Sequence, residues 1–233
     1  MNMMGRSQRF FQRGYQAGRP AVALLVCALL LGSCFIPERY QSEVRLTKDG
    51  SYGITFIGVL TYAPLFGQIA RGKITPEKAE EQIRMFKNFL QQDSYFKEVQ
   101  SLGSGRFQVR YEREGRFEGT DQMVNFPSRQ YAVFRISTNL RGEVTIAVSG
   151  RGYMYADSFE EVGLSTQGLF RVSTDATVID HNAQFIREAP YPDFMMYDWR
   201  PRSFRQIPPK IVVKLAVDPR TGAPAYGAFQ DDK

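Results

Sequence analysis

Few residues of this 233-residue sequence are of types that form or break covalent bonds. There are two cysteines, Cys27 and Cys34, and one histidine, His181. Cys34 follows two small residues, Gly32 and Ser33, and small residues beside a cleavage site are typical of exported chains that a peptidase trims. This pattern indicates cleavage between Ser33 and Cys34, which would place the Cys34 thiol at a new N-terminus.

The segment before Cys34 has the composition of an export signal. It contains four arginines and no acidic residue, and such a leader stays on the cytoplasmic side while an apolar segment enters the membrane. The apolar run Ala21–Leu31 has eleven residues. As a helix it measures about 16 Å, against roughly 30 Å of hydrocarbon, which is too short for a permanent span. We therefore expect residues 1–33 to be removed, with translation starting at Met1, Met3, Met4 or further on.

The four residues Leu31-Gly32-Ser33-Cys34 resemble the lipobox of bacterial lipoproteins. The resemblance implies that Cys34 carries a thioether-linked diacylglycerol and an acylated amino group, and that Cys27 leaves with the signal. Several acyl chains bind a membrane durably, at about 0.8 kcal/mol per buried methylene. Phe35 stands where an aspartate would imply retention in the inner membrane, so the resemblance favours the outer membrane, facing the periplasm. The alternatives are an ordinary secretory signal with a chance cysteine and a signal anchor that is never cut.

Charge and cysteine content exclude several classes of function for the mature chain. Without residues 1–33, which contribute four arginines, the net charge falls from +6 to +2. A nearly balanced domain lacks the clustered cations that nucleic-acid binding needs. Neither a disulfide nor an ordinary zinc site fits, because Cys34 would be the one cysteine left. Phosphate-binding and calcium-binding loop motifs are also missing from the sequence, so we expect no cofactor and no metal.

His181 is the distinctive candidate for catalysis. A single histidine can serve as the base of a serine triad, but the sequence contains no GxSxG motif. Carboxylate pairs such as those of glycosidases have visible candidates in Glu112 with Glu114 and Glu160 with Glu161. The alternative for these residues is an ordinary place on a solvated turn or strand face.

The mature sequence predicts an α+β fold, a mostly antiparallel β-sheet with one long amphipathic covering helix. Residues 34–41 are expected to be a tether, residues 42–217 a single domain, and residues 218–233 a flexible tail. Ser42–Thr47 and Tyr52–Tyr62 surround an Asp-Gly pair, which predicts a hairpin. Further strands are expected at Phe96–Gln100, Gly105–Tyr111, Gln130–Thr138, Glu143–Ser149, Leu169–Ser173, Thr177–Asp180 and Lys210–Val217.

The covering helix is expected to begin after Thr75. The threonine caps free amide groups, and Pro76 occupies the first helical position, where a missing N–H does no harm. One face of this helix collects apolar residues at helical spacing, namely Ala79, Ile83, Phe86 and Leu90.

Aromatic and methionine side chains gather between prolines near the C-terminus. The sequence predicts a possible binding loop formed by Tyr191, Phe194, Met195, Met196, Tyr197 and Trp199. Such a loop can line a groove for an acyl chain or a partner strand. The alternative is a satellite cluster that packs a long loop onto the core. Nearby arginines, which could meet lipid phosphates or form a solvated face, are Arg200, Arg202 and Arg205.

The segment Gly168–Trp199 resembles the last strands of lipoprotein domains of the LppM type. Its threonine–aspartate turn, Asn182 and Trp199 carry the resemblance, which implies a lipid-related envelope role. Together these observations predict a lipid-anchored cell-envelope protein with a non-enzymatic binding or scaffolding role. Its partners would be the membrane, through Cys34, and envelope proteins or lipid. The alternative functions are an envelope hydrolase acting on cell-wall or lipid substrates through His181, and a passive structural lipoprotein.

Overall fold

The computed structural model describes residues 35–218, 220 and 221. The expected signal, the cleavage site at Ser33 and Cys34, and residues 219 and 222–233 of the expected tail lie outside the described residues.

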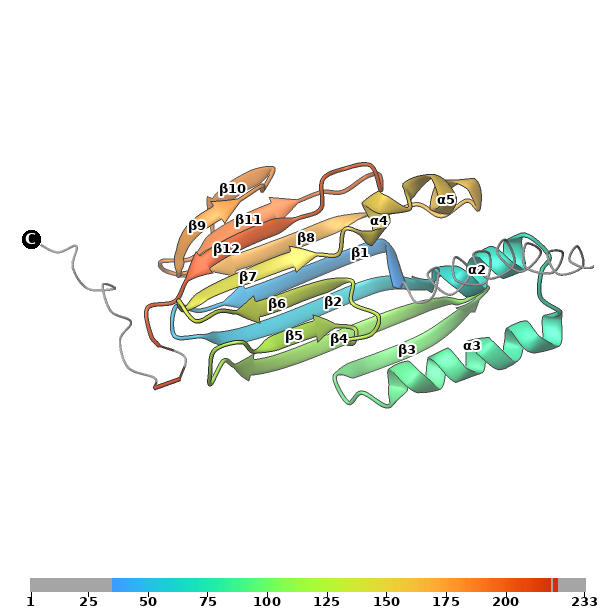
Figure 1. Ribbon diagram of the computed structural model, residues 1–233, viewed down its shortest axis with the longest axis horizontal. Helices are drawn as coiled ribbons and strands as arrows, with labels where there is room; N and C mark the ends of the chain where they lie inside the picture. The colour runs from blue at the N-terminus through green and yellow to red at the C-terminus, as the bar shows by residue number, and fades with distance from the viewer. Residues whose placement is uncertain (1–34, 219, 222–233) are drawn as a thin grey trace, which may run out of the picture. The chain divides into compact units, whose positions relative to one another are not determined.

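The described residues form twelve strands in two sheets (Figure 1). The seven-stranded sheet has the order β10 (Phe185–Glu188), β11 (Met195–Trp199), β8 (Gln167–Thr174), β1 (Phe35–Leu46), β2 (Ser51–Tyr62), β4 (Arg106–Arg116), β3 (Phe96–Gly103). The five-stranded sheet has the order β5 (Met123–Phe126), β6 (Phe134–Thr138), β7 (Glu143–Val148), β12 (Lys210–Lys214), β9 (Thr177–His181). Neighbouring strands are antiparallel except β1 and β8, which run parallel at the centre of the larger sheet.

The predicted hairpin is confirmed. β1 and β2 pair antiparallel, with Leu46 opposite Tyr52 beside the turn. Asp49 shapes this turn by accepting hydrogen bonds from the hydroxyl of Thr47 and from the amide of Ser51. Short polar residues of this kind stabilise turns by bonding to nearby backbone groups.

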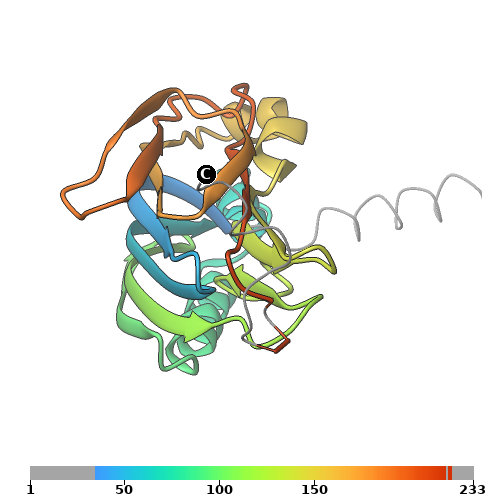
Figure 2. The same cartoon turned by 90° about the vertical axis from the view of Figure 1, so that its left-hand side faces the viewer.

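The two sheets face each other across a shared apolar core (Figures 1 and 2). Aromatic rings carry much of the contact: Phe126 of β5 lies 4.7 Å from Phe56 of β2 and 4.8 Å from Tyr111 of β4, between ring centroids. Phe134 of β6 approaches Phe170 of β8 at 5.4 Å. The expected fold class is therefore wrong in its main feature, because a second sheet covers the first.

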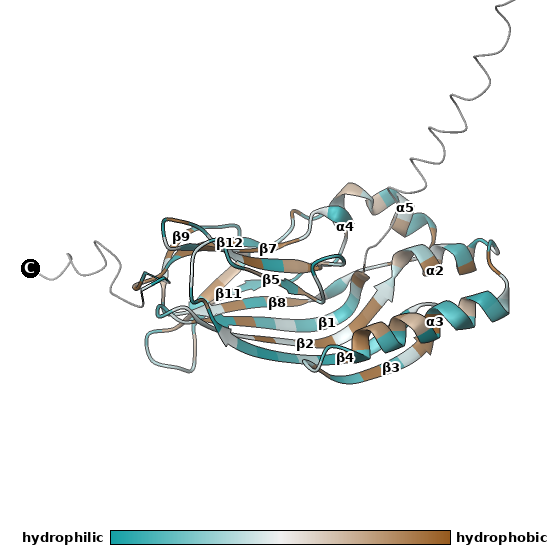
Figure 3. Ribbon diagram, turned by 60° about the horizontal axis from the view of Figure 1, so that its bottom comes forward, coloured by the Kyte–Doolittle hydropathy of each residue, from teal (hydrophilic) through white to brown (hydrophobic). Residues whose placement is uncertain are grey.

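The helices are too short to do that covering. They are α2 (Ala63–Ala70), α3 (Pro76–Gln91), α4 (Arg151–Met154) and α5 (Ala156–Glu161). The predicted helix after Thr75 exists as α3, and the Thr75 hydroxyl accepts a hydrogen bond from Lys78 N at 3.5 Å. It runs alongside the edge strand β3 (Figure 3) and buries only Ala79, Phe86 and Leu90. Within the described part of the chain, no helix combines the length and apolar character needed to cross a membrane.

Residues 35–41, expected to belong to a tether, instead form the first half of β1. Both Phe35 and Ile36 are buried. Pro37 fits there because pairing with β8 begins only at Arg39 and the register with β2 shifts between Pro37 and Tyr40, and strand prolines are tolerated at strand starts and bulges.

Candidate functional site

The start of β1 is packed tightly into the domain. Phe35 is 3% exposed and its ring lies 5.5 Å from that of Tyr62 and 5.7 Å from that of Tyr131. Phe86 of α3 and Phe107 of β4 approach it edge-on. Aromatic pairs at these separations add to the stabilisation that burial alone provides, so the first described residue is part of the main core.

The next two residues, Ile36 and Pro37, are held by contacts with other parts of the domain. Ile36 belongs to a second, smaller apolar cluster with Ala63, Leu164 and Phe204 among its members. The carbonyl oxygen of Pro37 accepts a hydrogen bond from the hydroxyl of Thr166 at 2.8 Å. Phe35, Ile36 and Pro37 therefore each contact a different part of the domain.

Glu38 completes this attachment on the outer face of the sheet. Its buried carboxylate accepts hydrogen bonds from the Thr61 hydroxyl and from Arg106 Nε, the latter at 2.8 Å. The Arg106 guanidinium in turn lies 4.6 Å from the ring centroid of Phe66 in α2. A buried carboxylate needs such partners to offset its lost hydration, and here they join β1 to β2, β4 and α2.

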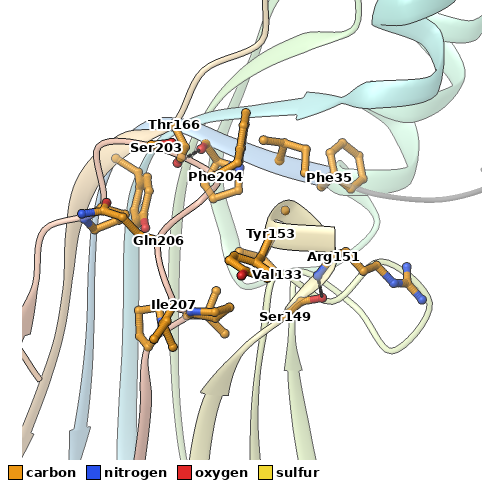
Figure 4. Close-up of a pocket in the computed structure, with 18 of the residues that line it drawn as sticks. Phe35, Val133, Ser149, Arg151, Tyr153, Thr166, Ser203, Phe204, Gln206 and Ile207 are labelled. Carbon is orange, nitrogen blue, oxygen red and sulfur yellow. Dashed lines mark hydrogen bonds between the residues drawn. The ribbon is translucent and has the colours of Figure 1, made fainter. Parts of the chain in front are cut away.

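A partly open cavity of about 80 Å³ lies beside the start of β1. Figure 4 shows that its lining comes from the first strand, from the end of β7 with α4, and from the segment 201–209. The lining is mostly apolar, with Phe35, Val133, Tyr153, Phe204 and Ile207 among its members. Pockets that enclose drug-sized ligands measure roughly 300–1,000 Å³, so this cavity is too small to enclose a whole ligand of that size.

The cavity is poorly equipped for acid–base chemistry. Among the residues that the structure describes, its lining contains no histidine, carboxylate, lysine or cysteine. The hydroxyl oxygens of Ser149 and Ser203 accept hydrogen bonds from the backbone amides of Arg151 and Arg205. Burial raises the pKa of Tyr40, which keeps its hydroxyl protonated and unfit as a base at neutral pH. The cavity therefore offers mainly apolar contacts to whatever enters it.

The other residues that the sequence offered as candidates for catalysis lie away from the cavity. His181 is exposed at the end of β9, where its Nδ1 accepts a hydrogen bond from Ala183 N. Its neighbour Asp180 pairs with Lys210 at 3.0 Å, and this contact holds the pKa of Asp180 below its ordinary value. None of these groups lines the cavity.

Three of the four glutamates that the sequence offered as carboxylate pairs are engaged in ion pairs. Glu112 lies 2.6 Å from Arg110 Nη2. Glu160 pairs with Arg205 at 2.9 Å and Glu161 with Arg71 at 3.4 Å. Glu114 is exposed on β4.

The expected binding loop is largely a strand. Met195–Trp199 forms β11, and Met196, Tyr197 and Trp199 are buried. Tyr191 and Phe194 lie in the turn before it, where their ring centroids are 6.2 Å apart. The apolar residues pack between other strands because β11 is an inner strand, flanked by β8 and β10, so they are not grouped on one loop surface.

Sequence reasoning missed the site at the start of β1. Phe35-Ile36 could have signalled it, since two large apolar residues beside the proposed cleavage point are unusual for a solvated tether. The predicted cleavage and lipidation residues, Ser33 and Cys34, lie outside the described residues.

Comparison with known proteins adds little. No protein-family model matches the chain, and no curated protein matches it. Among solved structures it is similar to the NMR structure of the folded domain of the Mycobacterium tuberculosis LppM protein, with a TM-score of 0.36 and 11% identity over 90% of this chain and 95% of that one.

Proposed function

We propose that this chain is a lipid-anchored protein of the cell envelope, attached through Cys34, whose domain has a non-enzymatic binding or scaffolding role. The observation that carries the proposal is the position of Cys34 in the motif Leu31-Gly32-Ser33-Cys34, one peptide bond before the buried Phe35. Consecutive Cα atoms lie about 3.8 Å apart, so the acyl chains would leave the protein directly at the surface of the folded domain.

The attachment of residues 35–38 supports an anchor of this kind. A pull on Cys34 would be transmitted to Phe35 in the main core, and through Glu38 to Arg106 on β4. Removing a buried aromatic side chain typically costs 3–5 kcal/mol, which indicates how firmly the first residue is held. Several acyl chains would keep such a domain on the membrane.

The choice of a non-enzymatic role is supported by the chemistry of the cavity. Acid–base catalysis needs a titratable group within hydrogen-bond reach of the reacting atoms, and the described residues that line the cavity include no histidine, carboxylate, lysine or cysteine. Phe35 directly after the proposed anchor favours the outer membrane over the inner one, with the domain facing the periplasm.

Metabolic labelling with an alkyne fatty acid tests this proposal. The wild-type protein should be labelled and should fractionate with membranes, whereas C34S should be unlabelled and released from the membrane fraction. C27S is the matched control, because Cys27 would leave with the signal, and it should be labelled like the wild type. An unlabelled wild-type protein, or a C34S variant that still carries the label, would overturn the proposal.

A further inference from the structure

Three exposed apolar side chains belong to segments that line the cavity at the start of β1: Tyr153 and Ile207 line it, and Met154 follows Tyr153 in the sequence. Tyr153 and Met154 belong to α4 and Ile207 to the segment 201–209. Met154 is 70% exposed and Ile207 75% exposed. We call these three residues the rim. Single exposed apolar residues are ordinary, but a group of them beside one opening marks a surface that contacts something apolar.

The rim is close to the first strand because of specific contacts. Tyr153, Ile207 and Phe35 line the same cavity (Figure 4). The amide of Val148 donates a hydrogen bond to the carbonyl of Pro209 at 2.9 Å, which holds the end of β7 against the segment 201–209. In Figure 1, α4 and the start of β1 lie at the same end of the two sheets.

We infer that the rim lies against the lipid bilayer, with the side chains of Tyr153, Met154 and Ile207 at the membrane interface. The inference rests on the proposed function, since it needs Cys34 to be acylated. An acyl anchor on Cys34, the residue directly before Phe35, leaves no linker between the bilayer and the domain. The end of the domain that contains Phe35 is thus the end that the anchor holds at the membrane.

The lipid anchor also explains why three apolar side chains suffice to keep this surface at the membrane. A surface of this size would bind a membrane weakly from solution. Linked to the bilayer, it meets the lipid at a high effective concentration, and weak contacts then become persistent. Apolar side chains on interfacial segments are buried by about 5–10 Å at the boundary of headgroups and acyl chains.

Charges near the rim suit a surface with anionic groups. Arg151 and Arg202 are exposed at this end of the domain. The three acidic residues of α5 are partly offset by two arginines, because Arg205 contacts Asp157 and Glu160 and Arg71 pairs with Glu161. Lipid phosphates attract arginines placed beside an apolar contact surface.

Leu140 provides an internal control with the same exposure. It is 75% exposed, like Ile207, but lies in the β6–β7 turn. The Gly142 carbonyl of that turn accepts a hydrogen bond from Leu215 N, and Ala216 N donates to Lys48 O in the β1–β2 turn. The β1–β2 turn follows the far end of the 12-residue strand β1, which is roughly 35 Å from Phe35 at the rise of a β-strand. Leu140 should therefore face water.

The test places an environment-sensitive fluorophore at these positions in the full lipidated protein, reconstituted into phosphatidylglycerol–phosphatidylethanolamine vesicles. Variants M154C, I207C and L140C each supply one free thiol, since the Cys34 thiol is blocked by the anchor. Emission at positions 154 and 207 should shift to the blue and be quenched several-fold more strongly by nitroxide-labelled lipids than emission at position 140. Equal unfolding transitions of the three variants would show that the fold is kept.

Two outcomes separate the inference from the proposal it rests on. Acylated protein whose probes at 154 and 207 behave like the probe at 140 would overturn the inference and leave the lipid anchor intact. Protein that carries no acyl group at Cys34, as read by mass spectrometry of the same sample, would overturn the proposed function itself.

Discussion

The indole Nε1 of Trp199 donates a hydrogen bond to Oδ1 of Asn182 at 2.8 Å. The same oxygen accepts a hydrogen bond from the amide of Lys210 at 2.8 Å, and Asn182 Nδ2 donates to the carbonyl of Pro208. Trp199 lies on β11 of the larger sheet and Lys210 begins β12 of the smaller one. One asparagine side chain thus joins the two sheets where their strands meet.

Replacing this asparagine should destabilise the domain. N182A leaves the buried indole N–H without its acceptor, and a buried unsatisfied group costs about 1–3 kcal/mol. Urea unfolding should show a loss of free energy of unfolding in that range. The control N88A, at an exposed position of α3, should change stability by less than about 0.5 kcal/mol. Equal stabilities of the two variants would contradict the role of Asn182.

A buried carboxylate on the other face of β11 should be more sensitive still. Asp198 is 1% exposed and receives two hydrogen bonds from Arg171, at 2.7 and 3.0 Å, and one from Arg187 at 2.9 Å. Breaking a buried ion pair typically costs 3–5 kcal/mol. D198N should lower the free energy of unfolding by about 3 kcal/mol, the lower end of this range, because Arg187 is half exposed and can recover hydration.

The matched control for this change is D180N. Asp180 is exposed on β9 and forms its ion pair with Lys210, and exposed pairs contribute little. Thermal unfolding should therefore separate the two variants clearly. If D198N and D180N unfolded at the same temperature, the contacts of Asp198 with Arg171 and Arg187 would contribute nothing to folding.

Local sequence signals were enough for part of the fold. The Asp-Gly turn specified the pairing of β1 with β2, and Thr75-Pro76 specified where α3 begins. The second sheet has no such signal. Its strand β12 pairs with β7 and β9, which lie far away in the sequence, and alternation of apolar residues reveals a strand without revealing its partner.

The start of β1 was misjudged for a related reason. Pro37, Glu38 and Arg39 are typical of a solvated segment when only neighbours in sequence are considered. Glu38 is buried because Thr61 and Arg106, both remote in sequence, supply hydrogen bonds to it. The candidate site depends on these long-range contacts, whereas the motif that ends at Cys34 is local and could be recognised directly. Its lipidation remains a prediction.

Gly58 should be intolerant of any side chain. A Cβ atom there would come within 2.4 Å of the carbonyl oxygen of Arg39 and 2.6 Å of Tyr40 Cα. These backbone atoms belong to the irregular part of β1 beside the cavity, so they cannot move without disturbing its lining. G58A should cost about 1–3 kcal/mol through overpacking.

Gly53 offers the comparison on the same strand. A Cβ atom at Gly53 would meet nothing within 4 Å, and alanine has the higher propensity for ordered backbone. G53A should therefore be neutral or slightly stabilising in chemical unfolding. The close approach at Gly58 would be refuted if G58A unfolded at the same denaturant concentration as G53A.

Asp49 should give the domain a pH dependence in the acid range. Hydrogen bonds from the Thr47 hydroxyl and the Ser51 amide hold the pKa of Asp49 below its ordinary value of 3.8. Because the pKa of Asp49 is lower in the folded state, the ionised carboxylate stabilises the fold when the pH is above the pKa of the unfolded state. This stabilisation is lost as the pH falls through the pKa of the folded state. Wild-type protein should therefore be more stable than D49N at about pH 6, and the gap should narrow from about pH 4 downward. Urea unfolding of both proteins over this range measures the gap, in which contributions from all other carboxylates cancel. A gap that stays constant with pH would rule out Asp49 as the titrating group.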